Sequence, residues 1–115
     1  SLVTLDVTRE EHLPQAVAAV RSQVDGLDLL INNAGMNLRG QSLGSYTREV
    51  MLETLHTNAV APILVGQAFL GLLRRGNQPK LVHISSQVGS FTWNAHGRSP
   101  LYAASKAALN MYTRC

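Results

Sequence analysis

Short apolar runs alternate with longer stretches of helical periodicity along this chain. Three of the runs, Leu2–Leu5, Leu27–Asn32 and Leu81–Ser85, are rich in aliphatic residues and end in polar or glycine-containing segments. Such runs predict strands, and the second is so continuously apolar that both of its faces should be covered, as in a parallel sheet.

The first helical stretch follows the first run and has one apolar face, formed by Leu13, Val17, Val20 and Val24. Its start has two interpretations. Thr8 and Glu11 have the spacing of a capping box, whereas Pro14 suits a first turn. Asp25-Gly26 predicts its end.

A second helical stretch extends from about Tyr46 to Arg75, and a third begins at Ser99-Pro100. The order strand, helix, strand, helix, strand, helix predicts parallel βαβ units. We therefore predict the α/β fold class, with a doubly wound parallel sheet.

Pro62 interrupts the second helical stretch. A proline there cannot donate to the carbonyl four residues earlier, which belongs to Asn58. The freed carbonyl needs a partner, so the sequence predicts a kink and a hydration site at Asn58. A kink that serves packing alone is the alternative.

The composition is that of a small globular domain, with 115 residues, 45% hydrophobic and 15% charged. The net charge is +3, but the basic residues are spread along the chain, so we do not expect nucleic-acid binding. The apolar stretches are shorter than the roughly 20 residues of a membrane span, and we expect none. The single cysteine, Cys115, suits a reducing compartment, and we expect a cytoplasmic protein.

Two motifs have the residue types of a catalytic or binding site. Tyr102 and Lys106 are four apart on a predicted helix, where an ammonium lowers the pKa of a neighbouring phenol and makes it a proton donor and acceptor. That pair alone arises by chance in roughly one chain in five of this length. Asn32-Asn33-Ala34-Gly35 is far rarer, and it directly follows a strand, where ligands of open α/β sheets bind. A surface pair and a plain turn are the alternatives.

The order of several motifs resembles that of the short-chain dehydrogenases/reductases, over essentially all 115 residues. The motifs are Asp6-Val7, Asn32-Asn33-Ala34-Gly35, Asn58, Ile84-Ser85-Ser86 and Tyr102-Ala103-Ala104-Ser105-Lys106. The chain is most similar to the carbonyl-reductase-like members. The resemblance implies a Rossmann-type fold and hydride transfer between NAD or NADP and a ketone or secondary alcohol.

The resemblance also implies roles for single residues. Tyr102 would be the general acid/base, Lys106 would bind the nicotinamide ribose, Ser86 would polarise the substrate oxygen, and Asn58 would connect Lys106 to solvent through a water. Ser85 and Ser86 point to opposite faces of a strand end, and the spacing to Gly89 selects Ser86. The cofactor-binding set would be Asp6, Val7, Asn32, Ala34, Gly35, Tyr102 and Lys106.

The sequence lacks two parts of the family pattern: the N-terminal glycine-rich unit that holds the pyrophosphate, and the C-terminal substrate lid. The first run would be the third strand of the sheet and the second run the fourth, with strands one and two between them. We therefore expect residues 1–115 to be the central, catalytic part of one dinucleotide-binding domain of roughly 220–280 residues, inactive alone. The family implies a homodimer or homotetramer.

Two further functions remain open. One is a non-catalytic cofactor-binding or signalling protein of the same fold, and the other is an inactive interaction fragment. Among the histidines, His83 alternates with apolar neighbours and is expected to be a hydrogen-bonded core residue, so no metal is expected. Trp93 and His96 lie in a loop that either shapes the substrate pocket or is solvated.

Overall fold

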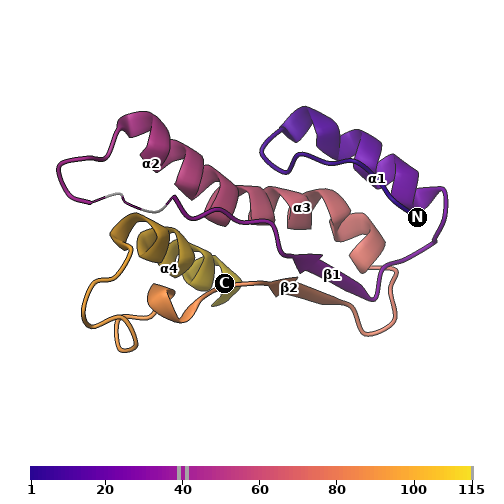
Figure 1. Cartoon of the computed structure of the whole chain (residues 1–115). Helices are drawn as coiled ribbons and strands as arrows, with labels where there is room; N and C mark the ends of the chain where they lie inside the picture. Colours follow the sequence, from indigo (N-terminus) through magenta and orange to yellow (C-terminus); the bar gives the residue numbers. More distant parts are fainter. Residues whose placement is uncertain (39, 41, 115) are drawn as a thin grey trace.

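A parallel two-stranded sheet lies along the lower side of the molecule in Figure 1, with helices above it. The structure is a computed structural model and describes residues 1–38, 40 and 42–114; the single cysteine, Cys115, lies outside them. Strand β1 (Leu29–Asn32) pairs with β2 (Lys80–His83), with Leu30 opposite Leu81. A parallel pair joined by a helical crossover confirms the α/β class, although only two strands of the sheet are paired here.

Helices account for most of the remaining structure. Helix α1 (Leu13–Arg21) follows a short 3₁₀ turn, η1 (Glu10–His12), and α4 (Pro100–Arg114) follows another, η3 (Gln87–Gly89), after an intervening loop. Between the strands lies one long helix made of α2 (Arg48–Leu55), a π-helical turn η2 (His56–Val60) and α3 (Ala61–Leu73).

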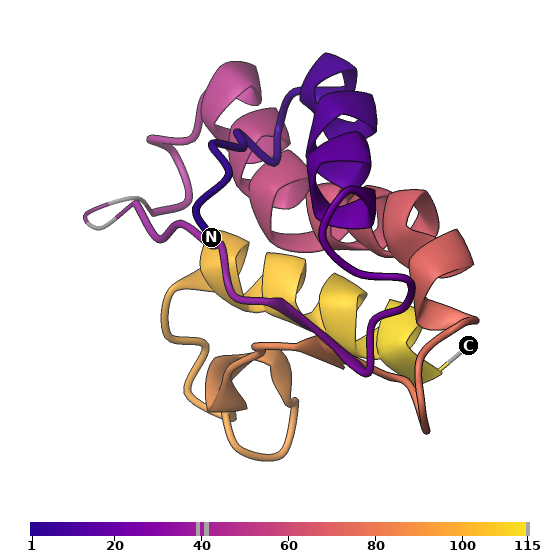
Figure 2. The same ribbon diagram turned by 90° about the vertical axis from the view of Figure 1, so that its right-hand side faces the viewer.

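The core forms where α1 packs on α3 on one side of the strands (Figures 1 and 2). Removing these apolar side chains from water is the main source of stability for such a layer. The buried members of this core cluster are Leu13, Ala16, Val65, Phe69 and Leu72.

The strand predicted at Leu2–Leu5 is not found, because no described segment pairs with it. The chain there is nevertheless strand-like, since Val3, Leu5 and Val7 pack against the core while the residues between them are exposed. A β-strand is defined by ladder hydrogen bonds, and the predicted neighbouring strands are not among these 115 residues.

The predicted capping box at Thr8 is also wrong. The hydroxyl of Thr8 donates to the Asp6 carboxylate at 2.7 Å instead of capping a helix, and η1 has no side-chain cap. Pro14 does occupy the first turn of α1, as the alternative interpretation predicted. This helix ends at Arg21, before the predicted Asp25-Gly26 stop.

Where the sequence predicts a kink before Pro62, the helix forms the π-helical turn η2, while the hydration site at Asn58 stays a prediction. The N–H of Ala61 bonds to the carbonyl of His56, five residues earlier, so the ladder changes register where the proline removes a donor. The consequence is that Asn58 lies in a distorted turn and is fully buried.

The expectation that no apolar stretch is long enough to span a membrane needs a correction at the helix Arg48–Leu73. By length and composition alone, these 26 residues are long and apolar enough to cross a bilayer. In the structure, α3 contributes Val65, Phe69 and Leu72 to the core, and η2 buries the polar Asn58. This is the packing of a central helix in a globular domain.

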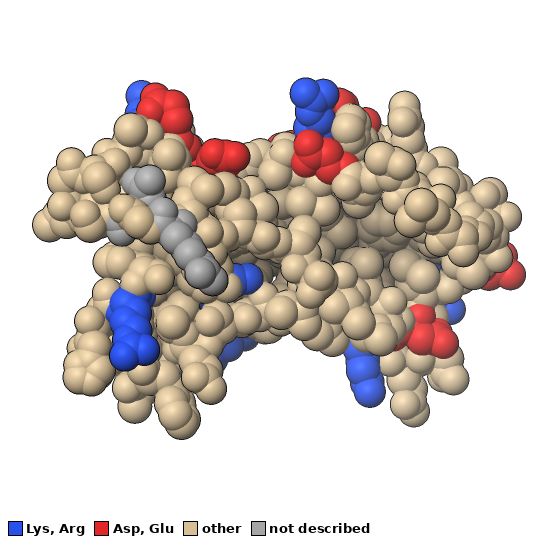
Figure 3. Space-filling model, in the orientation of Figure 1, with Lys and Arg blue, Asp and Glu red and all other residues tan. Residues whose placement is uncertain are grey.

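Charged side chains do not gather in one patch on the face shown in Figure 3, its grey atoms aside. Lysine and arginine atoms appear at separate points around a hollow in the middle of this face. The surface seen from this side therefore carries no concentrated field of one sign.

Candidate active site

Helix α4 lies beyond the carboxyl ends of both strands, and the arrowheads of β1 and β2 point toward it in Figure 1. In parallel α/β sheets this edge is where ligands bind. The loops that leave the strands carry Gly35 and Ser86, and α4 carries Tyr102 and Lys106. Topology therefore brings residues from three distant segments to one end of the sheet.

Asn58 connects these segments through its side-chain amide, which is fully buried. Its Oδ1 accepts from the Met36 N–H at 2.8 Å, and its Nδ2 donates to the Met36 carbonyl at 2.8 Å and to Ser105 Oγ at 2.9 Å. Ser105 Oγ in turn donates to the Tyr102 carbonyl at 2.7 Å. The loop after β1 is thereby fixed to the first turns of α4.

Lys106 is only 4% exposed, and its amine donates to the Ile84 carbonyl at 2.8 Å. Burial lowers the pKa of Lys106, because the charged form loses hydration. The amine also lies 5.7 Å from the centre of the Tyr102 ring. The predicted pair is thus in contact, with the cation beside the phenol.

Gly35 leaves room that a side chain would fill. A Cβ atom at this position would lie 3.3 Å from Asn58 Oδ1 and 3.6 Å from Lys106 Nζ. Ala34 and Gly35 are exposed, so the backbone here is open to a ligand, and a side chain at Gly35 would meet the buried amide and amine. Gly35, Asn58 and Lys106 therefore form one cluster.

Ser86 lies at the N-cap of η3, where its Oγ accepts from the Val88 N–H at a long 3.4 Å. Ser85 has a separate partner, since its Oγ donates to Asn110 Oδ1 at 2.5 Å. This difference agrees with the prediction that the two serines face opposite ways. Among the described residues, no hydrogen bond joins Ser86 to Tyr102 or Lys106.

Asn32 and Asp6 have hydrogen-bond partners outside the Asn58 cluster. Asn32 Nδ2 donates to the Pro62 carbonyl at 3.0 Å and lies 3.2 Å from Nδ1 of His83, whose pKa is lowered by burial. His83 is thus hydrogen-bonded, as predicted, but it is only partly buried and does not belong to the core. Asp6 is exposed, and its hydrogen bonds to the side chain and backbone of Thr8 lower its pKa.

Tyr102 opens onto a cleft of about 340 Å³. The other residues that line this cleft are Asn37, Leu38, Gly40, Tyr46, Ser99 and Leu101. The residue types include two hydroxyls and an amide, so the cleft offers hydrogen bonds to a small polar molecule beside the phenol. Ser99 has a φ of 48°, a strained value for a residue with a side chain.

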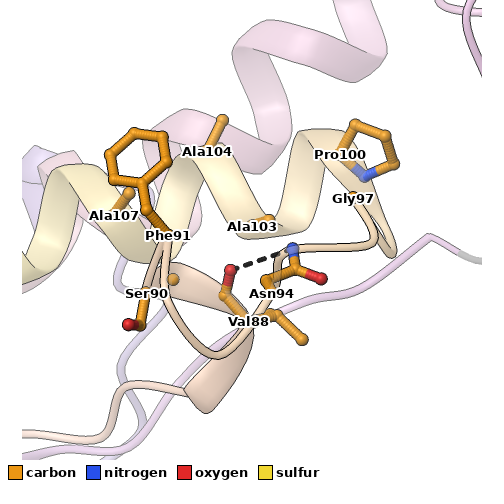
Figure 4. A pocket seen from close by; sticks show the side chains of 10 residues that line it. Val88, Ser90, Phe91, Asn94, Gly97, Pro100, Ala103, Ala104 and Ala107 are labelled. Carbon is orange, nitrogen blue, oxygen red and sulfur yellow. Dashed lines mark hydrogen bonds between the residues drawn. The ribbon is translucent and has the colours of Figure 1, made fainter.

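A second cleft of about 290 Å³ lies between α4 and the loop after η3 (Figure 4). Asn94 holds this loop together, with Nδ2 donating to the carbonyls of Val88 at 3.1 Å and Arg98 at 3.0 Å. Trp93 is 76% exposed, and with His96 it lines a further cleft. Within residues 1–38, 40 and 42–114, no three His, Cys, Asp or Glu side chains gather around one point.

Sequence reasoning missed Met36, Ser105 and Asn110 as parts of this network. Met36 contacts Asn58 through its backbone N–H and carbonyl, which every residue except proline has, so its side-chain type gives no hint of this role. Ser105 and Asn110 had a signal, because they follow Tyr102 and Lys106 at helical spacings of three and four. Those spacings become informative only once α4 is known to face the strand ends.

The fold and the cluster define an α/β protein with a Tyr-x-x-x-Lys helix at the carboxyl end of a parallel sheet. The sequence model of the short chain dehydrogenase family matches residues 1–115, the whole chain. The chain belongs to the short-chain dehydrogenase family.

Individual relatives agree with this assignment. The short-chain dehydrogenase srdF of Neurospora crassa is 35% identical over 97% of this chain and 46% of its own length. The C-signal of Myxococcus xanthus is 40% identical over 76% of this chain and 53% of its own. The NADPH-bound carbonyl reductase from chicken fatty liver is 38% identical, with a TM-score of 0.87 over all of this chain and 50% of that one. The chain thus spans about half the length of the relatives it matches.

Proposed function

We propose that this chain is the catalytic part of an oxidoreductase that interconverts a ketone and a secondary alcohol with NAD or NADP, in a protein that forms homodimers or homotetramers. The observation that carries the proposal is the buried Lys106 amine, which lies 5.7 Å from the centre of the Tyr102 ring and 3.6 Å from where a Cβ atom at Gly35 would be. A cation in that position supports proton transfer at the phenol.

The described residues fit a nicotinamide nucleotide. The space at Gly35 would be filled by a Cβ atom, and it adjoins an amine and an amide that suit ribose hydroxyls. When bound, the cofactor supplies the hydride. The residues that would hold it are Asp6, Val7, Asn32, Ala34, Gly35, Tyr102 and Lys106. They do not discriminate NAD from NADP.

The chain's own residues would handle the proton and the substrate oxygen. During reduction Tyr102 gives its phenolic proton to the carbonyl oxygen as the carbonyl carbon gains hydrogen, and during oxidation it takes that proton back. Ser86 donates a hydrogen bond to the same oxygen. Lys106 stabilises the phenolate, and Asn58 holds the loop and helix that bring these groups together.

The test is turnover by the full-length protein that contains these residues. We expect oxidation of NADH or NADPH with members of a panel of small ketones and aldehydes. Lys106→Met should abolish most of this turnover and weaken nucleotide binding, because the substitution removes the buried amine beside the Tyr102 ring. Lys80→Met, at the exposed start of β2, is the matched control and should leave both unchanged.

A second candidate is a signalling protein that binds the nucleotide without turning over a carbonyl. The similarity to a protein named C-signal favours it. Nucleotide binding by calorimetry without oxidation of NADH or NADPH on any carbonyl would favour this candidate, whereas turnover that depends on Lys106 would exclude it.

A further inference from the structure

Asn110 makes hydrogen bonds to residues on both sides of Ser86, the serine proposed to contact the substrate. Its Oδ1 accepts from Ser85 Oγ at 2.5 Å, and its Nδ2 donates to the Gly89 carbonyl at 3.3 Å. These two partners stand on either side of Ser86 in the sequence. Asn110 therefore spans the segment that carries Ser86 and uses both ends of its amide to do so.

The same segment is seated directly on the backbone of α4. A Cβ atom at Gly89 would lie 2.9 Å from the carbonyl carbon of Lys106 and 3.0 Å from the nitrogen of Ala107. Lys106 also bonds to the carbonyl of Ile84, just before the serines. The helix thus holds this strand end at three points: Ile84, Ser85 and Gly89.

Tyr102, Lys106 and Asn110 are spaced four residues apart, so they share one face of α4. The Ser86 side chain itself is weakly held: among the described residues its hydroxyl has one hydrogen bond, accepted from the Val88 N–H at 3.4 Å, while the Ser86 carbonyl accepts from the Gly89 N–H at 3.1 Å. Its place relative to Tyr102 therefore depends on how the residues on either side are fixed.

We propose that Asn110 is a positioning residue that sets Ser86 against the substrate oxygen, in register with Tyr102. The inference rests on the proposed function, because Ser86 must act on a carbonyl for its placement to matter. Asn110 does not touch the substrate; it acts through Ser86.

In the full-length protein, Asn110→Ala should lower kcat by about 10-fold to 100-fold, because small misplacements of a catalytic group have effects of that order. The Kd of NADPH should change less than about twofold, since the Gly35–Lys106 cluster is untouched. Ser85→Ala removes one of the two hydrogen bonds of Asn110, so it should lower kcat by a smaller factor. Thr113→Val removes a bond within α4, from Thr113 Oγ1 to the Leu109 carbonyl, and is the matched control that should keep full activity.

A double-mutant cycle separates positioning from general structural support. In a Ser86→Ala background, Asn110→Ala should have almost no further effect on kcat, because its target is gone. If instead the two losses multiply in full, Asn110 does not act through Ser86, and the inference is overturned. If Asn110→Ala fails to fold, Ser85→Ala replaces it in the cycle with the same two outcomes. No turnover by the wild-type protein on any carbonyl would overturn the proposed function itself, a result that cannot be confused with additivity in an active enzyme.

Discussion

At the scale of single residues, the site depends on buried polar side chains whose hydrogen-bonding capacity is used. The Asn58 amide makes three bonds, and Ser105 Oγ both accepts and donates. A buried polar group that loses its partner costs about 1–3 kcal/mol, so each member of such a network depends on the others. This makes the contacts around Asn58 specific as well as stabilising.

His83 provides a pH-dependent prediction at this scale. Burial lowers its pKa below the ordinary 6.5, so the unfolded state binds a proton more readily than the folded state. Stability should therefore be fully present above pH 6.5 and be lost as pH falls through the folded-state pKa. Protonation of Nδ1 would also remove its acceptor role toward Asn32, 3.2 Å away.

The measurement is urea unfolding of the full-length protein at a series of pH values from above 6.5 downward. His83→Asn cannot titrate in this range, so its free energy of unfolding should fall less with acid than that of the wild-type protein. Parallel losses in both proteins would show that His83 is not the titrating group.

At the scale of secondary-structure elements, local patterns predicted where the helices and the two paired strands lie, but the expected cover on both faces of β1 is wrong, because Leu29 and Ile31 are about half exposed. Pro62 predicted the irregular turn at Asn58 because its effect on the helix ladder is local. The prediction of a strand at Leu2–Leu5 was wrong, because a strand needs a paired neighbour and the apolar pattern does not show whether one is present. The capping box predicted at Thr8 was wrong, because the Thr8 hydroxyl donates to Asp6 instead. The spacing of the motif does not reveal this competing local interaction.

Two glycines near the end of α3 should respond in opposite ways to alanine. Gly71 has nothing within 4 Å of a Cβ position, so Gly71→Ala should stabilise the protein by about 0.5–1 kcal/mol through helix propensity. At Gly76 a Cβ would lie 1.9 Å from the Leu27 carbonyl oxygen, and backbone there cannot move aside cheaply.

Gly76→Ala should therefore lower the melting temperature, whereas Gly71→Ala should raise it. Thermal unfolding followed by circular dichroism measures both variants against the wild-type protein. Equal effects of the two substitutions would contradict the close approach of the α3–β2 turn to the segment before β1.

At the scale of the whole molecule, the site is assembled from segments that are far apart in sequence. Asn58 and Ser105 are 47 residues apart, and Lys106 and Ile84 are 22 apart. Residue types and spacing could nominate Tyr102 and Lys106, but the family resemblance was needed to connect them with Asn58 and Ser86. The hydrogen bonds of Asn110 to Ser85 and Gly89 could be found only in the folded structure, because these residues are more than 20 positions away in the sequence.

The candidate site lies at the end of a two-stranded sheet whose apolar side chains are partly exposed. Apolar strand side chains such as Leu29 and Ile31 are about half exposed, at 49% and 50%, in the two-stranded sheet. Strand edges and faces of this kind normally lie against further strands and helices. The chain spans about half the length of its relatives, so experiments on function belong to the full-length protein.

The central claim, that Tyr102 is the acid/base of a carbonyl/alcohol oxidoreductase, is tested most directly by the kcat of Tyr102→Phe. The loss of one hydroxyl should lower kcat by about 10²–10⁴-fold, the usual contribution of a general acid/base, with nucleotide binding and the melting temperature almost unchanged. Tyr112→Phe, at an exposed position later on the same helix, is the matched control and should retain full turnover. Wild-type turnover by Tyr102→Phe would contradict the claim.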